Sequence, residues 1–180
     1  MDFITVLPTS KGKDSIFVVV DKLTKYAHFI SISSKEKEIQ VADSYINNTF
    51  KIHGFPMVIV SDRDPKFTSK FWKELFHQVG TSLTMSTSYH PQTYRQTKVV
   101  NKCLEGYLRN FVNDRQTQWV QWIYLAERWY NSTYHTSTKM SPFEALYGYP
   151  LPTTREYVIN NFKVPAARDY LATSYEVIHI

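Results

Sequence analysis

The first third of the chain alternates short apolar runs with polar breaks. Residues 2–7, 15–21 and 27–33 are rich in β-branched and aromatic side chains, which favour strands. The run from Ile16 to Val20 contains no polar position, as expected of a strand that is covered on both faces. Because the connections between the three runs are short, the strands are predicted to pair as an antiparallel meander.

The period of the pattern changes in the middle of the chain. Apolar residues at helical spacing predict a helix over residues 39–50, and residues 57–61 predict a fourth strand. A second helix, capped by Thr68 or Ser69, separates this strand from a fifth one over residues 82–85. Strands reached through helices can pair in parallel by right-handed crossovers. The order therefore predicts an α/β fold, with a mixed five-stranded sheet flanked by helices.

The second half of the chain is predicted to be mainly helical. A polar loop over residues 86–95 precedes a long helix from about residue 96 to 113, whose apolar stripe includes Cys103. Further helices are predicted over residues 119–130 and from Ser141, where Ser, Pro and Glu form an N-terminal signal. The pattern weakens after Pro150, and a terminal helix is predicted over residues 164–178.

Composition narrows the class of protein. A chain of 180 residues that is 43% hydrophobic suits one globular domain and argues against disorder. The single cysteine excludes an internal disulfide framework and a cysteine-rich zinc site. No apolar run is long enough to cross a bilayer, and no cationic segment precedes an apolar stretch, so we expect an intracellular protein without a membrane partner. The net charge of +5 is compatible with an anionic partner such as nucleic acid.

Two aspartates stand where an α/β sheet commonly forms a site. Asp2 lies on the first predicted strand, and Asp62 follows the fourth. If these strands are neighbours, the two carboxylates can converge and offer oxygen ligands that suit Mg²⁺. The alternative is a structural role, because an aspartate after a strand is commonly a turn or cap residue and Asp64-Pro65 is itself a turn signal.

The chain also carries many ordered blocks of sequence that are found together in one family. The blocks are Asp2-Phe3-Ile4, Leu7-Pro8, Val18 to Leu23, Lys25 to Phe29, His53-Gly54, Ile59 to Asp64, Phe71 to Phe76, Tyr89 to Thr93, Gln96-Thr97, Val99-Val100-Asn101, Trp129-Tyr130-Asn131 and Pro142 to Gly148. Through them the chain closely resembles the integrase core of gypsy-type long-terminal-repeat retrotransposons, within the retroviral integrase superfamily, from residue 1 to about 150 and more faintly over residues 164–178.

The resemblance implies a fold, partners and a division of the chain. It implies an RNase H-like integrase core over residues 1–150 and a C-terminal extension over residues 151–180. The implied partners are DNA, both element ends and target, and further copies of the core in a homo-oligomer; the implied location is the nucleus. Relatives of this kind also carry an upstream His/Cys zinc module and a downstream DNA-binding domain, so the chain is expected to be a fragment of such a protein.

The family uses an Asp-Asp-Glu triad that binds Mg²⁺ or Mn²⁺, which implies that Asp2 and Asp62 are metal ligands. The third member is expected after 35 intervening residues, where this chain has Lys98. The family's loop pattern Asp-Gly-Gln-Thr-Glu reads Tyr-Arg-Gln-Thr-Lys over residues 94–98. An ammonium group cannot ligate a metal, so we expect the site to be weakened. Glu105 is about 10 Å further along the helix and Asp64 sits in a tight turn, so neither is expected to substitute.

Several basic and polar residues are candidates for contacts with nucleic acid. The long helix carries a basic stripe opposite its apolar face, whose alternative is an ordinary solvated helix face. The candidates are Lys66, His90, Gln92, Arg95, Lys98, Lys102 and Arg109. Three functions follow: a metal-dependent polynucleotidyl transferase, impaired at Lys98; a non-catalytic nucleic-acid-binding or self-associating remnant; or an RNase H-type nuclease, which shares the fold but not the later sequence blocks.

Overall fold

The computed structural model describes residues 1–85, 91–112, 116–152 and 164–169. The helices, in chain order, are α1 (Glu38–Tyr45), the π-helical turn η1 (Ile46–Phe50), α2 (Lys51–His53), α3 (Pro65–Thr68), α4 (Lys70–Gln78), α5 (Pro91–Val112), the 3₁₀ helix η2 (Gln116–Gln121), α6 (Ile123–Ser132) and α7 (Pro142–Tyr147). Among these described residues, no helix is long and apolar enough to cross a membrane.

The five predicted strands are all present. The first three, β1 (Asp2–Ile4), β2 (Ser15–Val20) and β3 (Ala27–Ile32), form the predicted antiparallel meander. The other two, β4 (Val58–Ser61) and β5 (Ser82–Met85), pair in parallel. The fold is therefore α/β, as expected.

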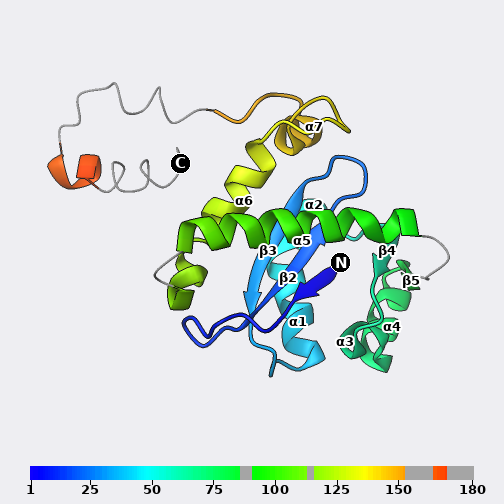
Figure 1. The fold of residues 1–180 in the computed structure, drawn as a ribbon. Coiled ribbons are helices and arrows are strands. Elements are labelled where there is room, and N and C mark those ends of the chain that lie inside the picture. Colours follow the sequence, from blue (N-terminus) through cyan, green and yellow to red (C-terminus); the bar gives the residue numbers. More distant parts are fainter. Residues whose placement is uncertain (86–90, 113–115, 153–163, 170–180) are drawn as a thin grey trace.

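The hydrogen-bonded ladder is divided, so that β1-β2-β3 and β4-β5 are two sheets instead of one continuous sheet. At the boundary between them, the Met1 amino group donates a 2.6 Å hydrogen bond to the carbonyl of Val60 in β4. Because β1 has only three residues, its outer edge offers little length for a ladder with β4. Figure 1 shows the N-terminus beneath α5, between β2 and β4.

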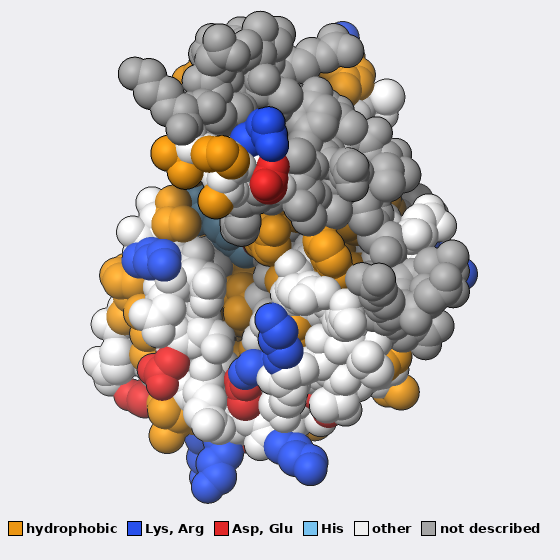
Figure 2. Space-filling view, turned by 90° about the vertical axis from the view of Figure 1, so that its left-hand side faces the viewer, with side chains coloured by type: hydrophobic (Ala, Val, Ile, Leu, Met, Phe, Trp, Pro, Cys, Tyr) orange, Lys and Arg blue, Asp and Glu red, His pale blue; other side chains and the backbone are white. Residues whose placement is uncertain are grey.

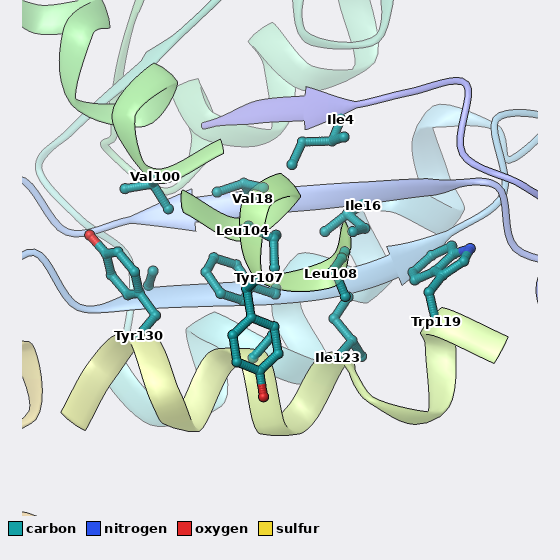
Figure 3. Packing of buried hydrophobic residues seen from close by; sticks show 13 residues of the cluster. Ile4, Ile16, Val18, Val100, Leu104, Tyr107, Leu108, Trp119, Ile123 and Tyr130 are labelled. Carbon is teal, nitrogen blue, oxygen red and sulfur yellow. The ribbon is translucent and has the colours of Figure 1, made fainter. Parts of the chain in front are cut away.

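Helices cover both faces of the three-stranded sheet, because alternate strand residues point to opposite sides. Ile16 and Val18 pack against α5 and α6, and the cluster on that face is drawn in Figure 3. Phe17, between them, packs on the other face with residues of α1, α3 and α4, including Tyr45 and Trp72. The central strand β2 is thus buried on both faces, as its apolar run predicts.

Side chains of α6 close the free edge of β3. The carboxamide of Asn131 accepts a hydrogen bond from the backbone N–H of Ala27 at 2.9 Å and donates one to the Ala27 carbonyl at 2.8 Å. Glu127, one turn earlier, accepts from the backbone N–H of Phe29 at 2.8 Å. An unpaired strand edge is a template for aggregation, and here the helix satisfies it from within the same chain.

The predictions for the helical half need three corrections. Helix α5 begins at Pro91 and not near residue 96, because proline suits the first turn of a helix and Arg95 favours helix more than the family's glycine does. Cys103 is exposed, although it was predicted to lie in the apolar stripe. The helix predicted over residues 119–130 is divided into the 3₁₀ helix η2 and α6.

The predicted C-terminal extension is largely outside the described part of the chain. Residues 165–169 are helical, within the range predicted for a terminal helix, and residues 153–163 and 170–180 are outside the description. The division at residue 150 therefore stays a prediction.

Candidate functional site

Asp2 lies on β1 with its side chain on the face that α5 covers. It follows the same alternation as Ile4, which belongs to the core cluster beneath α5. Its side chain is almost fully buried, with the residue only 5% exposed. One carboxylate oxygen accepts from the backbone N–H of Phe3 and the other from Nδ2 of Asn101 in α5, both at 2.9 Å. The carboxylate is therefore held from two elements.

Asp62 follows the last residue of β4 and starts a tight turn. Its Oδ1 accepts a 3.1 Å hydrogen bond from the backbone N–H of Asp64. The Asp64 carboxylate is itself engaged, because it caps α3 by accepting from the backbone N–H of Lys66 at 2.9 Å. The prediction that Asp64 does not turn inward to join the site agrees with this geometry.

The structure brings Asp2 and Asp62 together. Their carboxyl groups lie close enough for each to shift the pKa of the other. Burial, together with the neighbouring charges of Asp2 and Asp64, raises the pKa of Asp62 to about 6. Burial also raises the pKa of Asp2. A nearby negative charge favours the protonated form of a carboxyl group, whereas a bound cation would favour the ionised form.

Asn101 is a residue of this site that the sequence reasoning did not select. Its Nδ2 donates to Asp2, whereas its Oδ1 is buried and has no hydrogen-bond partner. A buried amide oxygen without a partner is unusual in folded proteins. The sequence signal that could have identified Asn101 is its spacing: it lies three residues after Lys98, and therefore on the same side of α5.

Lys98 occupies the place where the resemblance implies a glutamate. It lies in α5 and is exposed, one turn before the residue that binds Asp2. Glu105 is exposed on the following turns, so it supplies no nearby replacement. In the described ranges, no group of three His, Cys, Asp or Glu side chains could hold a metal ion. The oxygen ligands near one another are the two aspartates and the Asn101 amide, which are of the kind that Mg²⁺ binds.

The other predicted nucleic-acid residues are engaged with other groups, exposed on α5, or outside the described side chains. Lys66 is engaged locally: its ammonium group donates to the Ser34 carbonyl at 3.2 Å and lies 5.2 Å from the centre of the Phe3 ring. Lys102 and Arg109 are exposed on α5. His90 is outside the described residues, and for Gln92 and Arg95 only the helical backbone of α5 is described, not the side chains.

A pocket of about 710 Å³ lies where the two sheets meet. Its wall includes Met1 and Val60 at the boundary, Val20 of β2, and Gln96 and Thr97 of α5. Neither aspartate is among its lining residues. The pocket therefore adjoins the carboxylate pair without containing it.

The antiparallel meander, the parallel β4–β5 pair and the flanking helices define an α/β domain of the RNase H-like type. Residues 1–91 match the family model described as "Integrase core domain". The chain belongs to this integrase core family.

Relatives in fission yeast support the same assignment. The Tf2-3 and Tf2-4 transposon polyproteins of Schizosaccharomyces pombe are each 36% identical over 149 residues, which is 83% of this chain. That match spans only 11% of each polyprotein, so the chain corresponds to a small part of those relatives.

Solved structures show the fold independently of sequence. A chain of the simian T-cell lymphotropic virus intasome in complex with the PP2A regulatory subunit B56 gamma aligns with a TM-score of 0.68 at 15% identity, covering 91% of this chain and 58% of that one. The HTLV-2 integrase catalytic core domain in complex with magnesium, in its dimeric form, aligns with a TM-score of 0.60 at 14% identity, covering 80% of this chain and 92% of that one.

Proposed function

We propose that this chain acts in DNA integration as the core of a retrotransposon integrase, and that its transfer chemistry is impaired. The observation that carries the proposal is the meeting of the buried Asp2, from β1, with the partly buried Asp62, which follows β4. The family assignment supports DNA ends and target DNA as substrates.

In this proposal Asp2 and Asp62 hold Mg²⁺ or Mn²⁺. A pair of such ions, when bound, would supply activation of the attacking oxygen and stabilisation of the leaving one in transfer at a phosphodiester. The attack is in line, first by water and then by a DNA 3′-hydroxyl. Asn101 fixes the orientation of the Asp2 carboxylate through its N–H donor.

The impairment follows from the charge at position 98. A lysine in place of a glutamate removes an oxygen ligand and adds a positive charge on the helix face that carries Asn101. The resulting site holds its cation more weakly and less completely. Binding of DNA does not depend on that ligand.

The test is a strand-transfer and disintegration assay in Mg²⁺ and in Mn²⁺. We expect turnover by the Lys98→Glu variant at least about tenfold above the unmodified chain, because one carboxylate that can bind the cation directly is regained. The matched control is Lys102→Glu, which makes the same charge change one turn further along the exposed face of α5 and should not raise turnover. Efficient turnover by the unmodified chain would contradict the proposed impairment.

The second candidate, a non-catalytic nucleic-acid-binding module, is favoured by the exposed cations of α5. Lys102 and Arg109 lie on one side of the helix, clear of the core. Elsewhere the surface is mixed: on the face drawn in Figure 2, basic side chains project separately and do not form one continuous patch. A DNA contact through α5 is therefore testable at these two positions.

Replacing both Lys102 and Arg109 with alanine should weaken binding to duplex DNA. If each side chain neutralises one phosphate, the slope of log affinity against log salt should fall by about 1.8. A control that replaces the exposed Lys35 and Lys51, on and near the helices of the opposite face, makes the same charge change. Equal losses in both variants would mean that only net charge matters.

Self-association through the core is also part of the proposal. The HTLV-2 core domain was solved in dimeric and trimeric forms, which supports this expectation without showing it for this chain. Location in the nucleus, where the DNA target lies, is proposed on the same family grounds.

A further inference from the structure

We propose that the carboxamide oxygen of Asn101 is the third oxygen ligand of the divalent cation at the Asp2–Asp62 pair, taking over from the glutamate that Lys98 replaces. The inference rests on the proposed function in one respect, namely that the aspartate pair holds a cation. It assigns to Asn101 a metal-binding role at a position different from that of the family's glutamate.

The first support is position. Asn101 Nδ2 lies 2.9 Å from Asp2 Oδ2. Since the nitrogen and oxygen of an amide are about 2.3 Å apart, Asn101 Oδ1 lies within about 5 Å of that aspartate oxygen. Two ligands of one Mg²⁺ ion can be separated by about 4 Å. A small rotation of the soft terminal torsion of asparagine is therefore sufficient.

The second support is the unsatisfied oxygen itself. Asn101 Oδ1 is buried and has no partner, although an amide oxygen can accept two hydrogen bonds. Burial without a partner is costly, and a cation or its bound water would remove that cost. Amide oxygens are ordinary ligands for hard divalent ions.

The third support is the state of the carboxylates nearby. Asp64 caps α3 and is engaged there, and Glu105 is exposed further along α5. A neutral amide binds a cation less strongly than a carboxylate does. The chain would therefore retain a bound cation while transferring DNA poorly, in agreement with the proposed impairment.

A purely positioning role for Asn101 gives a different expectation. In that case only the N–H donated to Asp2 matters. Asn101→Asp keeps an oxygen at the site but loses the donor, and Asn101→Leu loses both at similar volume. A ligand role predicts opposite effects of the two variants, whereas a positioning role predicts that both weaken the site.

The experiment is Mn²⁺ titration of the whole 180-residue chain, without DNA, by calorimetry and electron paramagnetic resonance. We expect Asn101→Leu to weaken Mn²⁺ binding about tenfold and Asn101→Asp to strengthen it about tenfold. Circular dichroism and thermal melts of both variants confirm that each is folded; if the leucine variant does not fold, the aspartate variant alone decides the sign.

An Asp62→Asn variant separates failure of this inference from failure of the proposed function. If Asp62→Asn abolishes Mn²⁺ binding but Asn101→Leu leaves it unchanged, or if Asn101→Asp weakens it, the ligand role of Asn101 is overturned and the aspartate site stands. If the unmodified chain binds no Mn²⁺, or binds it equally after Asp62→Asn, the aspartate site and the inference both fail.

Discussion

An Asn131→Leu variant is expected to lose roughly 2–4 kcal/mol of unfolding free energy, because it leaves two buried backbone groups without partners. Asn131 is the residue that pairs with both the N–H and the carbonyl of Ala27 at the outer edge of β3. Ala27 is fully buried, so water cannot replace either bond. Leucine has nearly the same volume, and the loss therefore reports the hydrogen bonds more than a cavity.

Urea denaturation of the two proteins measures this loss. The neighbouring exposed residue provides the control: Ser132→Ala should change the unfolding free energy by less than about 0.5 kcal/mol. An Asn131→Asp variant sharpens the test, since its ionised carboxylate would face the Ala27 carbonyl without a proton to donate. It should recover stability as pH falls and the acid regains a donor. A loss below about 1 kcal/mol for Asn131→Leu would show that the edge of β3 is satisfied in another way.

An Asp62→Asn variant is expected to lose at least about 100-fold in Mn²⁺ affinity, because even changes outside the first ligand shell commonly cost 10–100-fold. In the absence of metal, by contrast, the same variant should be more stable than the unmodified chain at neutral pH. Burial and the neighbouring Asp2 raise the pKa of Asp62 to about 6 in the folded chain, above the value near 4 that the unfolded chain has. The folded state therefore binds this proton more tightly, and the associated stability is full below pH 4 and lost as pH rises through 6.

Asparagine has no charge to desolvate at this position. In a chelator, the Asp62→Asn variant should thus be more stable than the unmodified chain at pH 7, and the difference should disappear near pH 4. Thermal melts between pH 4 and pH 8 measure how the stability of the variant and of the unmodified chain changes with pH. The control is Asp43→Asn, which makes the same substitution on the exposed surface of α1, away from the carboxylate pair. A constant difference across the pH range would mean that Asp62 does not carry the shifted proton.

The strands could be predicted because their signals are local. The uninterrupted run of β2 and the short segment of β5 are bounded by polar residues, so pattern alone places them. The approach of Asp2 to Asp62 was predicted on the condition that β1 and β4 are neighbours. The two strands are not joined by a ladder, yet the carboxylates still meet at the junction between the sheets. The division into two sheets could not be predicted from the sequence pattern. It depends on the shortness of β1, which leaves few residues to pair with β4.

Other features depend on contacts between distant parts of the chain. Asn101 meets Asp2 across 99 positions of sequence, and Asn131 meets Ala27 across 104. Periodicity describes one helix at a time and does not show which neighbour a polar side chain reaches. Cys103 illustrates the limit within a helix: Leu104 and Tyr107 are buried, while Cys103 lies at the border of the stripe and is exposed.

The boundary between the two sheets has a mechanical consequence. Asp2 belongs to one sheet and Asp62 follows a strand of the other, with a pocket and the Met1–Val60 hydrogen bond at the junction. The distance between the two carboxylates is therefore set by side-chain packing. It can change more easily than if a ladder of backbone hydrogen bonds joined the two strands. A ligand that binds both carboxylates would therefore link the two sheets. Its binding should slow amide hydrogen exchange in β4.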